Sequence, residues 1–159
     1  MTPSAMMLSP NFALAEMTRS QTAACKGIDN TPSAAAVLAL TLLCRAVLEP
    51  LRSALARPIV INSGYRSPHL NRAIGGAAAS QHCLGEAADI ESPGMANGDL
   101  ALFIAAHLPF DQFILEAYTP GVPPSAWVHL SWKQRSLRNE MLTATPGPAG
   151  MRYSSGIHP

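Results

Sequence analysis

The sequence predicts an α+β fold in which helices flank a mainly antiparallel central sheet. Residues 34–48 are the longest apolar segment, and their large apolar side chains recur at spacings of three and four, as in a helix that packs one face on a core. Residues 111–118 and 125–132 are two apolar-rich segments joined by a proline-rich connection. Two such segments favour a hairpin of antiparallel strands.

The first half of the chain contains two predicted helices. Ser20 is the expected N-cap of a short helix that stops at Gly27. The apolar helix is expected to start after its cap, Thr31, with Pro32 in the first turn, where proline is tolerated. Pro50 should end or kink this helix, because proline has no amide hydrogen and clashes with the preceding turn. The predicted core-facing stripe consists of Leu40, Leu43, Val47 and Leu51.

The second half alternates predicted strands with short helices. Residues 58–63 are an expected strand, and the turn after it leads into a helix with Ser67 as its N-cap. Residues 86–90 are the next expected strand, and Asn97 can cap the helix that follows. Residues 138–144 are a candidate for the last strand.

Composition excludes several classes of protein. Charged residues make up 13% of the 159 residues, against roughly 25% in a typical domain, and the net charge is only +1. Neither nucleic-acid binding nor electrostatic attachment to a membrane is therefore expected. Arg45 interrupts the apolar segment, which is shorter than the roughly 20 residues of a membrane span, so it predicts a core helix and no membrane anchor. Residues 1–12 lack the pattern of a secretion signal, which predicts a protein that is cytoplasmic as synthesised.

Three residues are candidate ligands of one metal ion: His82, Asp89 and His129. His82 and Asp89 are seven residues apart, and an extended path between them would span roughly 23 Å. Zinc ligands lie about 2.0–2.2 Å from the ion, so this segment must fold back, and Gly85 supplies a permissive backbone for that. Two imidazoles and one carboxylate leave a fourth position for water, as in catalytic zinc sites.

Three separated motifs carry a resemblance to a known family. SGYRSPHLN, SQHCLGEAAD and WVHLSW, in that order, resemble the zinc D-alanyl-D-alanine carboxypeptidase and endopeptidase family, which shares its fold with hedgehog signalling domains. NFALAEMTRSQTA and LPFDQFILEAY also resemble the small phage-encoded branch of that family, so the likeness runs from residue 11 to residue 132. It implies a hedgehog/DD-peptidase-like fold, one Zn²⁺ ion on His82, Asp89 and His129, and the peptidoglycan stem peptide as substrate.

The resemblance also suggests two residues that contact the substrate. Arg66 is expected to hold a substrate carboxylate or the developing oxyanion through paired hydrogen bonds. The alternative for Arg66 is a structural ion pair. Ser80 is similar to the family position that hydrogen-bonds the substrate, and its alternative is to stabilise its own loop.

The general base is where the sequence departs from the best-known members of that family. These carry an acidic residue three positions before the last histidine ligand, where this chain has Ala126. We predict that Glu116 takes this role, because it lies on the strand expected to pair with the strand of His129. Alternatively, Glu116 only orients the His129 ring. The next candidates for the base are Asp111 and then Glu86 and Glu91.

These residues predict a zinc metallopeptidase that hydrolyses a bond of the stem peptide, as a D-Ala-D-Ala carboxypeptidase or an endolysin-type endopeptidase. The alternative is a non-catalytic, metal-containing module of the same fold that binds the cell wall. A non-haem iron oxygenase is disfavoured, because its histidine and aspartate ligands usually lie two residues apart. Family analogy suggests a phage lysin that reaches the wall through a holin, or a component of the virion.

The expected organisation is a flexible N-terminus at 1–10, a single zinc peptidase domain at 11–145 and a flexible tail at 146–159. We expect a monomer. The cysteines argue against a disulfide framework, because they are three in number and form no CxxC pair: Cys25, Cys44 and Cys83.

Overall fold

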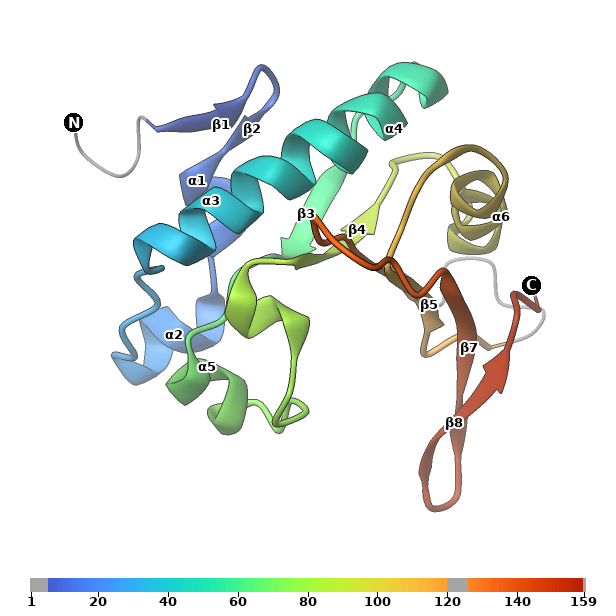
Figure 1. The fold of residues 1–159 in the computed structure, drawn as a ribbon. Helices are drawn as coiled ribbons and strands as arrows, with labels where there is room; N and C mark the ends of the chain where they lie inside the picture. Colours follow the sequence, from blue (N-terminus) through green and yellow to red (C-terminus); the bar gives the residue numbers. More distant parts are fainter. Residues whose placement is uncertain (1–5, 120–125, 159) are drawn as a thin grey trace.

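The computed structural model describes residues 6–119 and 126–158. A six-stranded sheet in the order β3-β4-β6-β5-β7-β8 forms its centre (Figure 1). All neighbouring strands are antiparallel except β5 and β7, which are parallel. The predicted α+β class and the mainly antiparallel sheet are therefore confirmed. The strands of the sheet are β3 (Val60–Ser63), β4 (Ala87–Glu91), β5 (Gln112–Glu116), β6 (Trp127–Ser131), β7 (Glu140–Gly147) and β8 (Gly150–Ser155).

Helices cover the sheet, and a small hairpin of β1 (Met7–Ser9) and β2 (Phe12–Ala13) lies beside the longest of them. This longest helix is one continuous rod (Figure 1). It consists of α3 (Ala34–Leu43), the π-helical turn η2 (Cys44–Leu48) and α4 (Glu49–Leu55). The others are α1 (Leu14–Thr18), α2 (Gln21–Lys26), α5 (Pro68–Ala73), the 3₁₀ turn η3 (Gln81–Leu84) and α6 (Asn97–His107).

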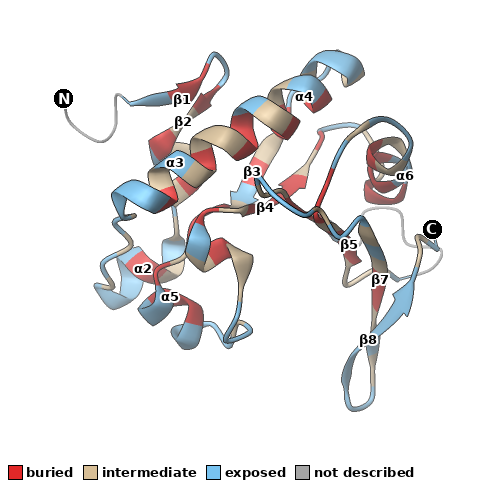
Figure 2. Cartoon of the chain, viewed as in Figure 1, coloured by how far each residue is buried: buried red, intermediate tan, exposed pale blue. Residues whose placement is uncertain are grey.

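The long helix packs as a core helix. Its predicted stripe is fully buried, with 0% exposure at Leu40, Leu43, Val47 and Leu51. The 22 residues Ala34–Leu55 are long and apolar enough to cross a membrane by length and composition alone. The length expected from the sequence, residues 34–48, was therefore too short. Burial of the stripe against the core accounts for part of that apolar character (Figure 2), since 39% of the apolar window is buried and Leu38 is 61% exposed.

Pro50 does not end the long helix, contrary to one outcome predicted from the sequence. The turn just before it widens, and the Glu49 amide donates to the Cys44 carbonyl, five residues earlier. Such a π-turn relieves the contact between the proline ring and the preceding turn while the helix axis continues. The helix then runs on to Leu55.

Two predicted caps are confirmed. The Ser20 hydroxyl accepts a hydrogen bond from the Ala23 amide, and Gly27 closes α2 with a left-handed φ of 63°. The Ser67 hydroxyl accepts from the Leu70 amide at the start of α5. Both caps satisfy amides that a helix leaves unpaired at its first turn.

Two other predicted caps are wrong. Ser33, and not Thr31, caps the long helix by accepting a hydrogen bond from the Ala36 amide. Asn97 is the first residue inside α6, and its side-chain amide donates to the Ala126 carbonyl at 2.8 Å. Serine and threonine have similar capping propensities, so the sequence did not separate Thr31 from Ser33, whereas the Asn97 side chain is used in its contact with Ala126.

Both ends of the described chain contain strands where the sequence predicted none. Leu8 and Ser9 in β1 are buried, and β8 pairs antiparallel with β7 through a tight turn. β1 has only three residues, and every residue of β8 is exposed, so neither strand carries the alternation that marks a half-buried strand (Figure 2). The boundaries expected at residues 10 and 145 stay a prediction.

Candidate metal centre

The three candidate metal ligands meet on one face of the central sheet. Asp89 of β4 and His129 of β6 are direct partners in the antiparallel register, so their side chains leave the sheet on the same side. His82 reaches them from η3. Its Nε2 lies 3.2 Å from His129 Nδ1 and 3.2 Å from Asp89 Oδ1, and His129 Nδ1 lies 3.0 Å from Asp89 Oδ1.

The loop that carries His82 folds back as predicted. Gly85 ends η3 with a left-handed φ of 76°, and a Cβ there would lie 2.5 Å from the Ala36 carbonyl oxygen. Glycine is therefore required both by its backbone angle and by close packing against the long helix. The His82 ring is 2% exposed and is held by a 2.7 Å hydrogen bond from Nδ1 to the Gly64 carbonyl.

This donor set fits a tetrahedral zinc ion. Ligands about 2.0–2.1 Å from zinc are separated from one another by about 3.3 Å in tetrahedral geometry. The three distances between the donor atoms are 3.0, 3.2 and 3.2 Å. Donation from His82 Nδ1 to a carbonyl leaves the lone pair of Nε2 free for an ion, which is the usual outer-shell arrangement of a metal-binding histidine.

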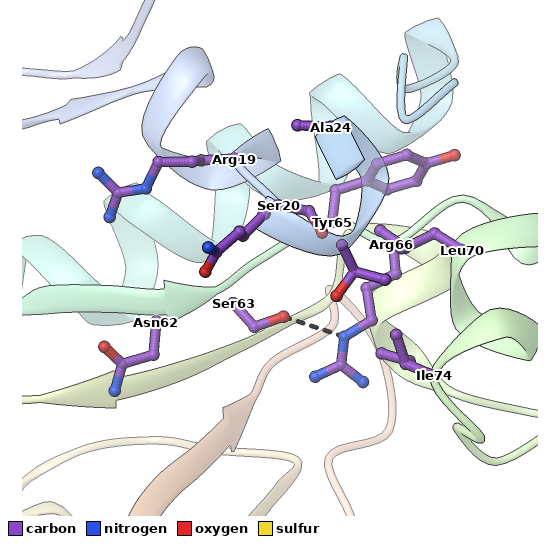
Figure 3. Close-up of a pocket in the computed structure, with 11 residues that line it drawn as sticks. Arg19, Ser20, Ala24, Asn62, Ser63, Tyr65, Arg66, Leu70 and Ile74 are labelled. Atoms are coloured by element: carbon purple, nitrogen blue, oxygen red, sulfur yellow. Dashed lines mark hydrogen bonds between the residues drawn. The ribbon is translucent and has the colours of Figure 1, made fainter. Parts of the chain in front are cut away.

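Arg66 pairs with Asp89 through the carboxylate oxygen that does not face the histidines. Arg66 Nη2 is 2.7 Å from Asp89 Oδ2, and its Nε donates to Ser63 Oγ at 2.9 Å (Figure 3). Burial alone would raise the pKa of Asp89, but the close contacts of its carboxylate with His129 and His82 outweigh burial and hold that pKa well below its usual range. Asp89 is therefore ionised, and the structural ion pair considered for Arg66 is present.

Glu116 lies on β5 and faces the same cleft as the three candidate ligands. It pairs with Trp127, two residues before His129, so Glu116 and His129 are diagonal neighbours on one face. Within the described residues no hydrogen bond joins Glu116 to the His129 ring, so the structure does not support the alternative that Glu116 orients this ring. Burial raises the pKa of Glu116, and the Asp89 carboxylate adds to this effect.

The cleft has a volume of about 650 Å³, and its walls come from separate parts of the chain. Arg66 and Ser80 both line it, and their contact with a substrate stays a prediction. Ser80 also accepts a 3.3 Å hydrogen bond from the His82 amide, so it stabilises its own loop. Met151 and Tyr153 of β8 line the cleft as well, and the sequence analysis missed them because β8 was not expected.

A second cavity of about 670 Å³ is also lined by Arg66 (Figure 3). It shares Arg66 and Ile74 with the cleft, so the two hollows adjoin. Arg19 and polar side chains of α2 and β3 line it, and none of its lining residues is acidic. The positive charge of Arg19 and Arg66 in its lining suits an anionic group.

The alternative bases lie elsewhere. Asp111 is 0% exposed and is held by Arg138 Nη2 at 2.7 Å and by Gln81 Nε2 at 3.0 Å. Neither Glu86 nor Glu91 lines the cleft. Ala126, three positions before His129, has a left-handed φ of 77°.

Asp111 gives a prediction about stability and pH. Burial would raise its pKa, but hydrogen bonds from Arg138 lower the pKa of Asp111 to about 2. A depressed pKa stabilises the fold above the unfolded value of about 3.9, and this contribution is lost as the pH falls toward 2. Asp111→Asn is therefore expected to lower the free energy of unfolding by about 2 kcal/mol at pH 6.

Urea unfolding at pH 6 and pH 3 measures this difference, with Asp99→Asn at an exposed position of α6 as the control. The difference between wild type and Asp111→Asn is expected to shrink at pH 3. An equal difference at both pH values would contradict the assignment.

A protein-family model described as Peptidase M15 matches residues 10–131. The match includes Arg66, Glu116 and all three candidate ligands, and it ends before β7 and β8. No curated protein matches the chain.

Proposed function

Because the chain belongs to the peptidase M15 family, we propose that it is a zinc-dependent peptidase that hydrolyses a peptide bond in peptidoglycan stem peptides. The observation that carries the proposal is the shared cleft of Glu116 and the His82–Asp89–His129 cluster. The proposed base Glu116, the candidate metal centre and the Arg66 cation then line one cleft. We also propose that the fold is of the hedgehog/DD-peptidase type, in keeping with the family and the mainly antiparallel sheet.

His82 Nε2, His129 Nδ1 and Asp89 Oδ1 would hold one Zn²⁺ ion. When bound, the ion supplies a Lewis acid for the scissile carbonyl and lowers the pKa of a water toward about 7. Glu116 accepts a proton from the attacking water and returns it to the leaving amine. Arg66 holds Asp89 in place through Nη2, and its guanidinium lines the cleft, where it would stabilise charge that develops on the substrate.

Incubation of the purified, zinc-loaded protein with intact peptidoglycan tests this function. The expected result is a set of soluble peptide fragments, identified by mass spectrometry, that disappears with a chelator and returns with added zinc. The identity of the new ends distinguishes carboxypeptidase from endopeptidase activity.

A non-catalytic wall-binding module is the second candidate, and Ala126 is the observation in its favour. It predicts that the folded, zinc-loaded protein sediments with peptidoglycan and releases no fragments. That outcome would replace the peptidase proposal.

A further inference from the structure

The β7–β8 hairpin forms one wall of the cleft, although it lies beyond the residues that match the family. Figure 1 shows it extending away from the body of the sheet. Two of its side chains line the cleft together with Trp127 of β6, and all three are partly open to solvent: Met151 is 41% exposed, Tyr153 57% and Trp127 37%. This apolar, aromatic surface is continuous with the surroundings of Glu116.

The order of the strands places the proposed catalytic groups in a row. Arg66 follows β3 at one edge, the ligands Asp89 and His129 lie on β4 and β6, and Glu116 lies on β5. β7 and β8 come next. The hairpin is therefore on the Glu116 side of the candidate metal centre, and Arg66 is on the opposite side.

The chemistry of hydrolysis gives this row a direction. The C–N bond breaks, the water oxygen bonds to the carbonyl carbon, and the proton that Glu116 takes from the water passes to the leaving nitrogen. The leaving nitrogen must therefore lie beside Glu116. The residues that follow it in the substrate lead away from the metal centre toward β8.

We propose that Tyr153 and Met151 bind the part of the substrate that follows the scissile bond, and that this part is a peptide of at least two residues. The inference rests on the proposed function and adds its substrate class, an internal bond of the stem peptide and not the terminal one. Tyr153 and Met151 are then specificity-determining residues.

Dimensions support a leaving peptide of this length. Neighbouring strands are about 4.8 Å apart, so β8, two strands beyond β5, lies roughly 10 Å from the strand of Glu116. An extended peptide spans about 3.5 Å per residue, so two or three residues cover that distance. The pKa of Tyr153, raised by burial and by the Glu116 carboxylate, agrees with a ring that leans from β8 toward the base.

The test compares the double variant Met151→Ala/Tyr153→Ala with the wild type and with Arg152→Ala, on the same exposed strand but outside the cleft lining. The probes are the stem pentapeptide L-Ala-D-Glu-L-Lys-D-Ala-D-Ala and the dipeptide D-Ala-D-Ala. Dissociation constants are measured by calorimetry in a Glu116→Gln background, which blocks turnover. Products from the proteins that retain Glu116 are identified by mass spectrometry, and circular dichroism checks the fold.

The double variant is expected to bind the pentapeptide about tenfold more weakly or worse, with dipeptide binding unchanged and Arg152→Ala like the wild type. The wild type is expected to release a fragment of two or more residues. Unchanged pentapeptide affinity in the double variant, or free D-Ala as the sole product, would overturn the inference and leave the peptidase proposal standing. If the wild type does not hydrolyse the pentapeptide but the double variant loses affinity as expected, the proposed peptidase function is wrong. The β7–β8 hairpin is then a surface that binds peptide without cleaving it.

Discussion

Replacing His82 by alanine is expected to remove both zinc binding and peptide hydrolysis. His82 Nε2 forms one corner of the ligand triangle, 3.2 Å from each of the other two donor atoms, and its ring is 2% exposed. Alanine offers no donor atom, and Asp89 and His129 alone would leave the ion with two protein ligands. If the ion supplies only about 4 kcal/mol of transition-state stabilisation, its loss lowers kcat/KM by about 10³-fold.

Elemental analysis of the purified variant measures its zinc content, and the release of new amino groups from peptidoglycan measures its activity. His69→Ala is the matched control, because His69 is an exposed histidine on α5 and does not line the cleft. Circular dichroism separates loss of the site from loss of the fold, since the Gly64 carbonyl also loses its partner. A folded His82→Ala protein that keeps its zinc and its activity would remove His82 from the metal centre.

The convergence of the candidate ligands was predictable because each of its parts has a local cause. Alternation of apolar residues fixes the faces of β4 and β6, which places Asp89 opposite His129. Gly85 marks the place where the His82 loop must reverse. The position of Glu116 was predictable for the same reason, since a hairpin between β5 and β6 brings its side chain to the face of the sheet that carries His129.

Other features depend on tertiary contacts that leave no local pattern. The ion pair of Arg66 with Asp89 joins residues 23 positions apart through the pairing of β3 with β4, which sets Ser63 opposite Asp89. β8 pairs with β7 while every one of its residues is exposed, so backbone hydrogen bonds and not burial define that strand. The widened turn before Pro50 was equally hidden, because sequence rules for proline describe a regular α-helix.

Glu116→Gln is expected to lower kcat by about 10²–10⁴-fold while zinc content and KM change little. Glutamine keeps the shape of the side chain but cannot accept the proton of the attacking water. The same substitution at Glu91 is the matched control, because Glu91 lies on β4 outside the cleft lining.

The pH profile decides whether Glu116 is the base or only a neighbour of the site. A base must be ionised to act, so wild-type kcat/KM is expected to fall as the pH drops through the pKa of Glu116, which burial raises above its ordinary value. The residual activity of Glu116→Gln is expected to lack this acidic limb. A variant that is slow but keeps the limb would mean that another group accepts the proton, and wild-type turnover in Glu116→Gln would exclude Glu116 from catalysis altogether.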